Sequence, residues 1–339
     1  MRPTIYIFLL TFLLTSFETL AQDAELSQFY NAPTMFNSAE IGHRISGGKF
    51  RFNGVHRNFG EGFKTTNLAF DNTIDWKDRS HMGIGGAFIH DETGNGAFQT
   101  MTFLVGVGLH MSLDVKEEHF LSIGTQFGIV NNQLRTEKLI FETDIIGGKG
   151  EDFINTNLFN LDSRLGLLYS YFPNETVQLK IGFSANHFVS FVNHFISDFS
   201  TINTQFSASI DYSQTFNDEK WIINPHLLFL SQGSFNQGLV GILATRNCEN
   251  KKGFTFGVSY KTADLSTFNS MNSRDAAIAI VGIRLESGSR IYASHSFNIS
   301  PLNNMNNATG NFELGVQWII NSVKNKRITT PDILRNQGN

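Results

Sequence analysis

Long stretches of this chain alternate between apolar and polar residues with a period of two. From Thr176 to Ser190 the odd positions run Val, Leu, Ile, Phe, Ala, His, Val, while the even positions begin with Thr, Gln, Lys, Gly, Ser and Asn. The same alternation occurs in residues 119–131, 159–171 and 311–320. Because successive side chains of an extended strand point to opposite faces, these segments predict β-strands with one apolar and one polar face.

Counting such segments gives about 14 strands in an all-β fold. Their predicted bounds are 45–56, 65–74, 80–91, 97–111, 118–131, 158–171, 176–190, 203–214, 219–231, 235–246, 253–261, 276–286, 289–298 and 309–321. Several reach the roughly 9 to 11 residues with which a tilted strand crosses a bilayer. Only 17% of the residues are charged and 33 of 339 are Phe, so the strands have a large apolar surface to cover. No stretch reaches the roughly 20 apolar residues of a membrane-spanning helix, which excludes a helical membrane protein.

The predicted connections sort by length. If the first strand starts in the periplasm, the periplasmic connections are all brief, at 75–79, 112–117, 172–175, 215–217, 247–252 and 287–288. Every long connection falls on the other side, at 132–157, 191–203, 262–275 and 299–308. Short periplasmic turns and longer external loops are typical of outer-membrane barrels. We therefore predict a transmembrane antiparallel outer-membrane β-barrel with both termini in the periplasm.

The first 21 residues have the features of an export signal peptide. Arg2 is followed by an apolar core at 5–14 and by a small-x-small cleavage site at 19–21. We expect a mature protein in the bacterial outer membrane, with a periplasmic or lumenal N-terminal segment at 22–44, the barrel at 45–321 and a basic periplasmic tail at 322–339. Because the segment at 22–44 lacks strand alternation, we expect it to fill the lumen or to contact a partner.

The polar strand faces predict which side chains point into the barrel. These residues are Gln126, Asp162, Arg164, Gln178, Lys180, Arg284, Glu286, Glu313 and Gln317. Pairs such as Asp162 with Arg164 and Arg284 with Glu286 either line a channel or hold the interior together. Glycines such as those at 83–86 and 106–108 are interpreted as small interior residues. Aromatic residues near strand ends are candidates for the two girdles at the membrane surfaces, namely Phe63, Phe141, Tyr171, Phe172, Trp221, Tyr260, Tyr292 and Trp318.

The sequence gives little support for catalysis or for a cofactor. His43, His56, His81 and His90 lack the i, i+4 helical spacing and the close carboxylates of a zinc site. No Gly-x-Ser-x-Gly segment is present, so hydrolases that use that nucleophile turn are excluded. The single cysteine, Cys248, excludes a multi-cysteine metal site, and a net charge of -4 without a basic patch argues against nucleic acid. We predict a non-enzymatic protein without cofactor or metal.

Motifs near the expected mature N-terminus resemble a known family. They are Gln22-Asp23, Ser27-Gln28-Phe29-Tyr30-Asn31-Ala32-Pro33 and Phe36-Asn37-Ser38-Ala39 before Gly42. This order resembles the opening of the PorP/SprF family of type IX secretion system membrane proteins, with Ala32 in place of an Asn and Ser38 in place of a Pro. Further likeness lies in His56-Arg57-Asn58 and in Gly85, His90-Asp91 and Gly94.

The resemblance implies an outer-membrane barrel of Bacteroidetes that assists export and surface anchoring of a specific large secreted protein or adhesin, as in gliding-type machinery. The implied partners are outer-membrane lipid, the C-terminal region of the secreted protein and periplasmic type IX secretion components. The motif residues then become candidates for partner contact, namely Gln28, Phe29, Tyr30, Asn31, Pro33, Asn37, Arg57, Asn58, Asp91 and Gly94.

Three other interpretations stay open from sequence alone. A barrel-embedded phospholipase or protease would gather its Ser, His and acidic residues from distant strands, which a single sequence does not reveal. An outer-membrane channel or transporter for a small hydrophobic or polar solute has a similar strand number and shows conductance or a bound amphiphile. An exported β-sandwich lectin dissolves without detergent.

Overall fold

The computed structural model describes residues 23, 25–43, 50–59, 62–77, 79–139, 156–189, 192–193, 200–216, 220–248, 252–263, 274–299 and 310–320. The predicted signal peptide at 1–21 and the predicted tail at 322–339 lie outside these ranges. Among the described residues, no helix combines the length and the apolar character that crossing a membrane requires.

Fourteen strands form a closed antiparallel barrel, which confirms the predicted fold class. The strands are β1 (Phe50–Phe59), β2 (Phe63–Lys77), β3 (Ser80–Thr93), β4 (Phe98–Ser112), β5 (His119–Leu134), β6 (Asn157–Asn174), β7 (Val177–Asn186), β10 (Gln205–Phe216), β11 (Trp221–Gln232), β12 (Phe235–Asn247), β13 (Gly253–Ala263), β14 (Arg274–Arg284), β15 (Arg290–Asn298) and β16 (Asn311–Ile320). Pairing of β1 with β16 closes the barrel. The short strands β8 (Val192–Asn193) and β9 (Ser200–Thr201) form a separate two-stranded sheet between β7 and β10.

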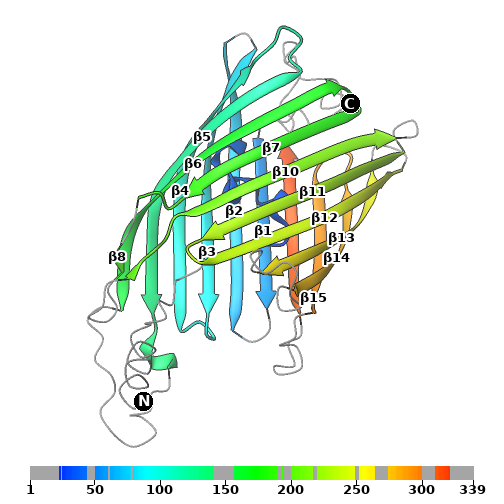
Figure 1. Cartoon of the computed structure of the whole chain (residues 1–339). Helices are drawn as coiled ribbons and strands as arrows, with labels where there is room; N and C mark the ends of the chain where they lie inside the picture. Colours follow the sequence, from blue (N-terminus) through cyan, green and yellow to red (C-terminus); the bar gives the residue numbers. More distant parts are fainter. Residues whose placement is uncertain are drawn as a thin grey trace, which may run out of the picture.

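The connections between strands sort by length between the two ends of the barrel. We call one end the short-turn end; it carries the connections at 78–79, 113–118, 175–176, 217–220, 248–252 and 285–289. The opposite, long-loop end includes the connections at 135–156, 187–204, 264–273 and 299–310, and β8 lies there (Figure 1). Phe50 at the start of β1 pairs with Ile320 at the end of β16, so the barrel strands begin and end at the short-turn end.

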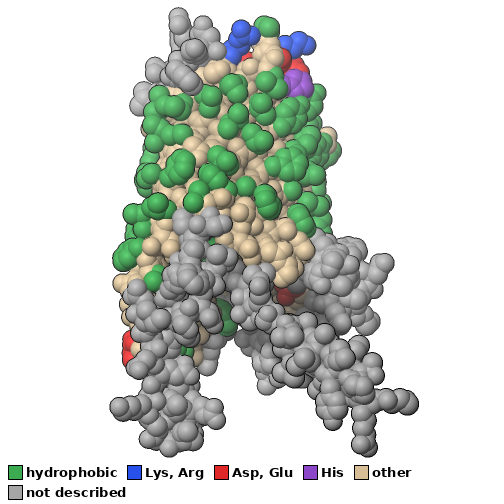
Figure 2. All heavy atoms as spheres, turned by 60° about the vertical axis from the view of Figure 1, so that its left-hand side comes forward, with side chains coloured by type: hydrophobic (Ala, Val, Ile, Leu, Met, Phe, Trp, Pro, Cys, Tyr) green, Lys and Arg blue, Asp and Glu red, His purple; other side chains and the backbone are tan. Residues whose placement is uncertain are grey.

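The outer surface of the barrel is apolar. Phe103, Val105 and Phe183 are 56%, 69% and 57% exposed, and the neighbouring inward residues Thr102 and Leu104 are buried. Figure 2 shows hydrophobic side chains covering the wall of the barrel, with charged side chains toward its ends. In water this band would be an exposed apolar surface far larger than a soluble monomer tolerates, whereas a bilayer solvates it.

Most predicted strand ends differ from the structure by one to five residues, and two of these differences change the placement of a side chain. β7 ends at Asn186, because His187 takes a positive φ of 56° and turns inward instead of continuing the apolar face. β14 ends at Arg284, and the turn that follows is closed by hydrogen bonds from Leu285 N to Ser289 O at 2.8 Å and from Gly288 N to Leu285 O at 2.9 Å. Glu286 lies exposed in this turn, so its predicted lumenal position is wrong.

Two of the predicted girdle residues also face inward. Phe172 and Tyr292 are 5% and 3% exposed, whereas Phe63 and Trp318 are 42% and 47% exposed on the outer face. Phe141 lies outside the described residues. Proximity to a strand end does not define the direction of a side chain, since adjacent positions point to opposite faces.

The apolar band gives a first testable prediction. Val105 lies at the middle of β4, and Val105→Arg should lower the free energy of unfolding in lipid vesicles by about 2–4 kcal/mol, because a cation at the bilayer midplane is poorly solvated. Val115→Arg is the matched control, since Val115 is 82% exposed in the 113–118 connection. Denaturant titration followed by Trp fluorescence measures both values, and equal effects of the two substitutions would contradict the membrane orientation.

Candidate functional site in the barrel lumen

The described part of the N-terminal segment lies inside the barrel. At the long-loop end, Asp23 N donates to Gln232 Oε1 at 3.0 Å; near the short-turn end, His43 Nε2 lies 2.9 Å from Ser170 Oγ. Most residues between these two points are buried. We call residues 23 and 25–43 the lumenal segment. It crosses the barrel from the long-loop end to the short-turn end, where β1 begins.

The lumenal segment folds into three short helical turns, η1 (Phe29–Asn31), α2 (Pro33–Phe36) and η2 (Ser38–Glu40). Pro33 occupies the first turn of α2, where a missing N–H costs nothing. Asn37 caps η2, because its Oδ1 accepts a hydrogen bond from Ala39 N at 2.9 Å. Its Nδ2 also donates to Leu167 O on β6 at 2.9 Å. Pro33 and Asn37 therefore shape the segment and fix it to the wall.

Glu313 on β16 holds the upstream half of the lumenal segment. Its carboxylate is fully buried and accepts hydrogen bonds from the backbone N–H groups of Ser27 and Gln28, at 2.8 and 2.9 Å. The Gln28 amide donates in turn to Ser294 Oγ at 2.8 Å and to Glu313 O at 3.0 Å. Charge-assisted hydrogen bonds of this kind compensate the burial of a carboxylate.

A row of four glycines lets the downstream half approach the wall. Gly83, Gly108, Gly124 and Gly166 lie directly opposite one another on β3, β4, β5 and β6. A Cβ atom at any of them would overlap atoms of the lumenal segment. At Gly83 and Gly108 the overlap is with the backbone around Ile41, and at Gly124 and Gly166 it is with the stretch from Asn37 to Ala39. The row forms a groove in which the segment lies against the strand backbones.

Charged pairs fix the segment near the short-turn end. Glu40 Oε1 lies 2.8 Å from Lys180 Nζ on β7. Arg51 on β1 donates to Glu40 O at 2.6 Å and to the carboxylate of Asp71, which also accepts from Gly42 N at 2.6 Å. Burial alone would raise the pKa of Glu40, but the interactions with Lys180, His43 and Arg51 together outweigh burial and lower that pKa to about 2. Glu40 is thus a carboxylate at any physiological pH.

A second charged cluster holds the start of the segment at the long-loop end. His187 lies between two carboxylates, with Nε2 2.8 Å from Asp23 Oδ2 and Nδ1 2.8 Å from Asp162 Oδ1. Arg164 Nε donates to Asp162 at 3.0 Å and Arg164 Nη1 donates to Met35 O at 3.1 Å. Burial by itself would lower the pKa of His187, but the two carboxylates raise it to about 9. At neutral pH His187 is therefore an imidazolium.

Glu25 makes a similar link to the opposite wall. Its Oε2 accepts from Lys261 Nζ at 2.7 Å and from Gln237 Nε2 at 2.8 Å, and Lys261 also lies 2.8 Å from Asp275. Arg57 on β1 donates to the backbone carbonyl of Glu25. The segment is thus attached to both sides of the lumen at the long-loop end.

The lumen also contains an apolar core. Phe29 and Phe36 pack edge to face with ring centroids 6.2 Å apart. They belong to one buried cluster with inward leucines of β11 and β12, namely Leu228, Leu230, Leu239 and Leu243. These two strands therefore carry apolar side chains on both faces, which explains why their alternation is weak in the sequence.

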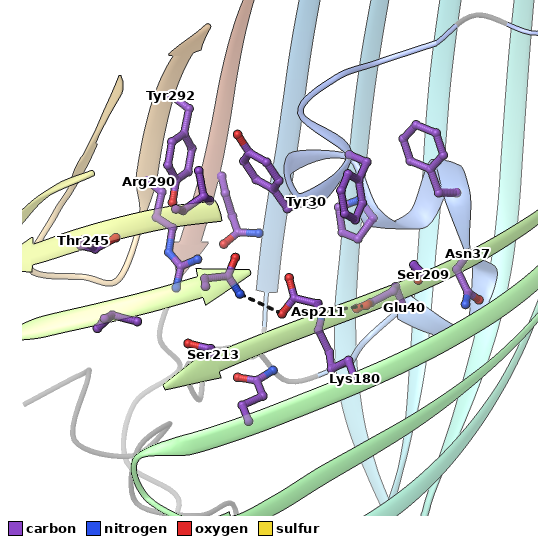
Figure 3. Close-up of a pocket in the computed structure, with 18 of the residues that line it drawn as sticks. Tyr30, Asn37, Glu40, Lys180, Ser209, Asp211, Ser213, Thr245, Arg290 and Tyr292 are labelled. Atoms are coloured by element: carbon purple, nitrogen blue, oxygen red, sulfur yellow. Dashed lines mark hydrogen bonds and ion pairs between the residues drawn. The ribbon is translucent and has the colours of Figure 1, made fainter. Parts of the chain in front are cut away.

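A cavity lies beside the lumenal segment, in the half of the lumen nearer the short-turn end. It has a volume of about 110 Å³ and lies between the segment and strands β7, β10, β11, β12, β14, β15 and β16. Figure 3 shows Tyr30 and Glu40 of the segment on one side, with Lys180, Asp211, Arg290 and Tyr292 around the rest. In the part of the chain that is described, no group of three or more His, Cys, Asp or Glu residues could hold a metal ion.

The structure separates the predicted motif residues into two groups. Gln28, Phe29, Tyr30, Asn31, Pro33 and Asn37 lie in the lumenal segment, and four of them contact residues of the barrel wall, namely Gln28, Phe29, Tyr30 and Asn37. Arg57, Asn58, Asp91 and Gly94 lie toward the long-loop end. Asn58 is exposed, Asp91 accepts from Thr65 Oγ1 at 2.6 Å, and Gly94 has the positive φ of 62° that its turn requires.

Most of the predicted lumenal residues are close to the segment or the cavity. Gln126, Asp162, Arg164, Arg284, Glu313 and Gln317 are buried, and Gln178 and Lys180 line the cavity. The sequence interpretation missed Arg51, Asp71 and His187. Arg51 and Asp71 lie directly opposite on β1 and β2, so pairing these two strands by register identifies them. No sequence signal places His187 beside Asp23.

Comparisons with known proteins agree with the fold and the motifs. The family model described as "Type IX secretion system membrane protein PorP/SprF" matches residues 18–318, which confirms the resemblance. Among solved structures, the toluene transporter TbuX of Ralstonia pickettii has a TM-score of 0.50 at 10% identity, covering 86% of this chain and 94% of that one. The toluene transporter TodX of Pseudomonas putida has a TM-score of 0.46 at 10% identity, covering 85% and 91%. No curated protein sequence gives a significant match.

The glycine groove gives a prediction about the lumenal segment. Gly124→Val should displace the segment, because the added side chain would occupy the position of Ser38, and overpacking of this kind costs about 1–3 kcal/mol. We expect a lower free energy of unfolding and a higher conductance in planar bilayers than for the unaltered chain. Gly54→Val is the control, since a Cβ there would meet only the side chains of Leu68 and Phe52 at 3.4 Å. If Gly124→Val changed neither the free energy of unfolding nor the conductance, the groove would not be the binding site of the lumenal segment.

The His187 cluster gives a prediction with a defined pH dependence. The pKa of His187 is raised from 6.5 to about 9, so its stabilisation is complete below pH 6.5 and is lost as the pH rises through 9. This difference corresponds to about 3 kcal/mol. The loss of unfolding free energy caused by His187→Gln should therefore be large at pH 6.5 and small at pH 10. The outward-facing, exposed His56→Gln is the control, and a pH-independent effect of His187→Gln would refute the assignment.

Proposed function

Because the chain belongs to the PorP/SprF family of type IX secretion system membrane proteins, we propose that it is a non-enzymatic outer-membrane component that assists export and surface anchoring of one large secreted protein. The gliding-type adhesins are the class of cargo that we favour. The family and the barrel fold point to a component of secretion machinery rather than to an enzyme.

One structural observation supports binding rather than conduction as the main role. The lumenal segment is attached at both ends of the lumen, to Glu313, to the His187 cluster and to Lys180, through buried charged or charge-assisted contacts. A protein whose interior is occupied in this way interacts with other macromolecules mainly through its two ends.

We propose that the long-loop end faces the cell exterior and holds the C-terminal region of the secreted protein. The short-turn end then faces the periplasm and contacts other secretion components. A feature that supports such contact is the 113–118 connection, where Leu113 and Val115 are 57% and 82% exposed. These two exposed side chains offer a small apolar contact surface for another protein.

A channel for a small solute is the second candidate. It is favoured by the fold shared with TbuX, which is a toluene transporter, although a likeness at 10% identity extends to the fold alone. A channel predicts solute-dependent uptake or a steady conductance for the unaltered chain. The filled lumen argues against a wide aqueous pore.

Deletion of the gene tests the proposed function. We expect one large surface protein to disappear from the cell surface and to accumulate inside the cell or in the medium, and a plasmid copy of the full chain to restore it. Protease shaving followed by mass spectrometry of surface peptides measures the change. An unchanged surface proteome together with lost uptake of a small apolar solute would favour the channel instead.

A further inference from the structure

A row of aromatic side chains crosses the outer face of the barrel at the short-turn end. Phe216, Trp221, Arg246 and Phe254 lie directly opposite one another near the ends of β10, β11, β12 and β13. Phe216 and Phe254 are 44% and 56% exposed. Aromatic side chains on the outer face of a membrane barrel concentrate at the two surfaces of the bilayer. The row therefore marks one membrane surface on this side of the barrel.

Arg246 is a cation within this aromatic row. Its guanidinium carbon lies 5.3 Å from the centroid of the Trp221 ring, which is the geometry of a cation–π contact. Deeper in the membrane the outward residues of β12 are the exposed Val240 and Ile242, and toward the turn the next outward residue is the exposed Cys248. Arg246 thus lies where the apolar wall ends. A cation is costly at the bilayer midplane, but at this level it meets the phosphates of the lipid headgroups.

Lys252 places a second cation beside the first. It is exposed and lies two positions before Phe254, just ahead of the start of β13. Cys248 N donates to Lys252 O at 2.7 Å, so the pairing of β12 with β13 continues by one further residue pair. Lys252 is therefore the diagonal cross-strand neighbour of Arg246. Long side chains at such positions, about 7–8 Å apart, can reach one common ligand.

Neither cation has a carboxylate partner. In the part of the chain that the structure describes, the side-chain contact of Arg246 is the ring of Trp221, and neither Arg246 nor Lys252 forms an ion pair. The exposed Glu286 of the 285–289 turn is paired with neither of them. By contrast, the buried cations of the lumen each lie beside a carboxylate, namely Arg51, Arg164, Lys180 and Lys261. Stacking on Trp221 uses the flat face of the guanidinium, and its N–H donors, which lie in the plane, are left for an oxyanion.

An apolar strip leads from the two cations toward the middle of the membrane. It consists of exposed side chains on β13 and β14, namely Phe254, Phe256, Val258, Val281 and Ile283. A free phosphate ion or an acidic protein would use the two cations and leave this strip uncovered. A glycerophospholipid carries a phosphate next to its acyl chains, so it covers both parts of the surface.

We propose that Arg246 and Lys252 bind the phosphate of an anionic glycerophospholipid, and that one acyl chain of this lipid lies along the apolar strip. The guanidinium donates in its own plane to the phosphate oxygens, and the ammonium group of Lys252 supplies the second positive charge. The inference goes beyond the proposed function. Only the assignment of the lipid to the periplasmic leaflet rests on it.

The single cysteine of the chain allows a direct test. Cys248 is exposed between the two cations, and an uncharged nitrobenzoxadiazole fluorophore can be attached to it without any substitution. The labelled full chain is placed in phosphatidylcholine nanodiscs with a small fraction of phosphatidylglycerol that carries a quenching nitroxide on its acyl chain. Phosphatidylcholine with the same nitroxide is the reference lipid. We expect phosphatidylglycerol to reach half-maximal quenching at a mole fraction at least about fivefold lower, as one cation near an anionic headgroup provides.

Arg246→Gln should lower this preference to below about twofold, because a neutral amide lacks both the charge and the planar fork of donors. Lys252→Gln should lower it as well. Lys116→Gln is the matched control, since Lys116 is an exposed lysine in the 113–118 connection at the same end of the barrel, and the preference should stay unchanged. Migration of each variant as a folded barrel in unheated gels shows that the substitutions leave the fold intact.

Three results would overturn the proposal. They are equal quenching by the two labelled lipids, an unchanged preference after Arg246→Gln, and loss of the preference on addition of hexaglutamate, which would identify an acidic peptide as the ligand. Each can occur while deletion of the gene still removes a surface protein. Failure of the lipid site is therefore distinguishable from failure of the proposed secretion function.

Discussion

Lipid offers no hydrogen bonds to the backbone of a strand, and this constraint determines the rest of the structure. An open sheet in a bilayer would leave a row of N–H and C=O groups without partners at each edge, so the strands must close on themselves. Closure through β1 and β16 satisfies both edges and leaves a lumen that the inward side chains do not fill. The chain fills it with its own N-terminal residues, and the result is a core that is apolar around Phe29 and Phe36 and polar elsewhere.

In the polar part of this core, buried charged and polar groups of the lumenal segment find their hydrogen-bond and ion-pair partners on the barrel wall, and those of the wall find theirs on the segment. A buried charge is stable only with a partner, and removal of one member of such a pair is typically more costly than the pair itself is worth. Glu40 and Lys180 illustrate a pair of opposite charges, whereas Glu313 is compensated by two backbone N–H groups. The glycine row contributes differently, since it brings the segment close enough for these contacts by omitting side chains.

Periodicity and loop length were sufficient to predict the barrel from sequence, because both follow from local geometry. The same information could not reveal contacts that depend on register. Gly83, Gly108, Gly124 and Gly166 lie in four different strands, and only the pairing of β3 to β6 aligns them. The alternation in the sequence assigned His187 to the apolar face of its strand. In the structure its positive φ turns the side chain inward, and a period-two pattern contains no sign of such a turn. The predicted lumenal position of Glu286 was wrong for a related reason, because β14 ends at Arg284, two residues before the alternation in the sequence ends.

The location of Glu313 has a consequence for biogenesis. The acceptor for the N–H groups of Ser27 and Gln28 lies in β16, 286 and 285 positions later in the chain, and β16 is also one side of the closing seam. Ser27 and Gln28 therefore obtain their partner only after β16 has been synthesised and delivered. In a polypeptide truncated before β16, the N–H groups of Ser27 and Gln28 would lack this acceptor. Binding of the lumenal segment in the barrel therefore requires that β16 is present and paired.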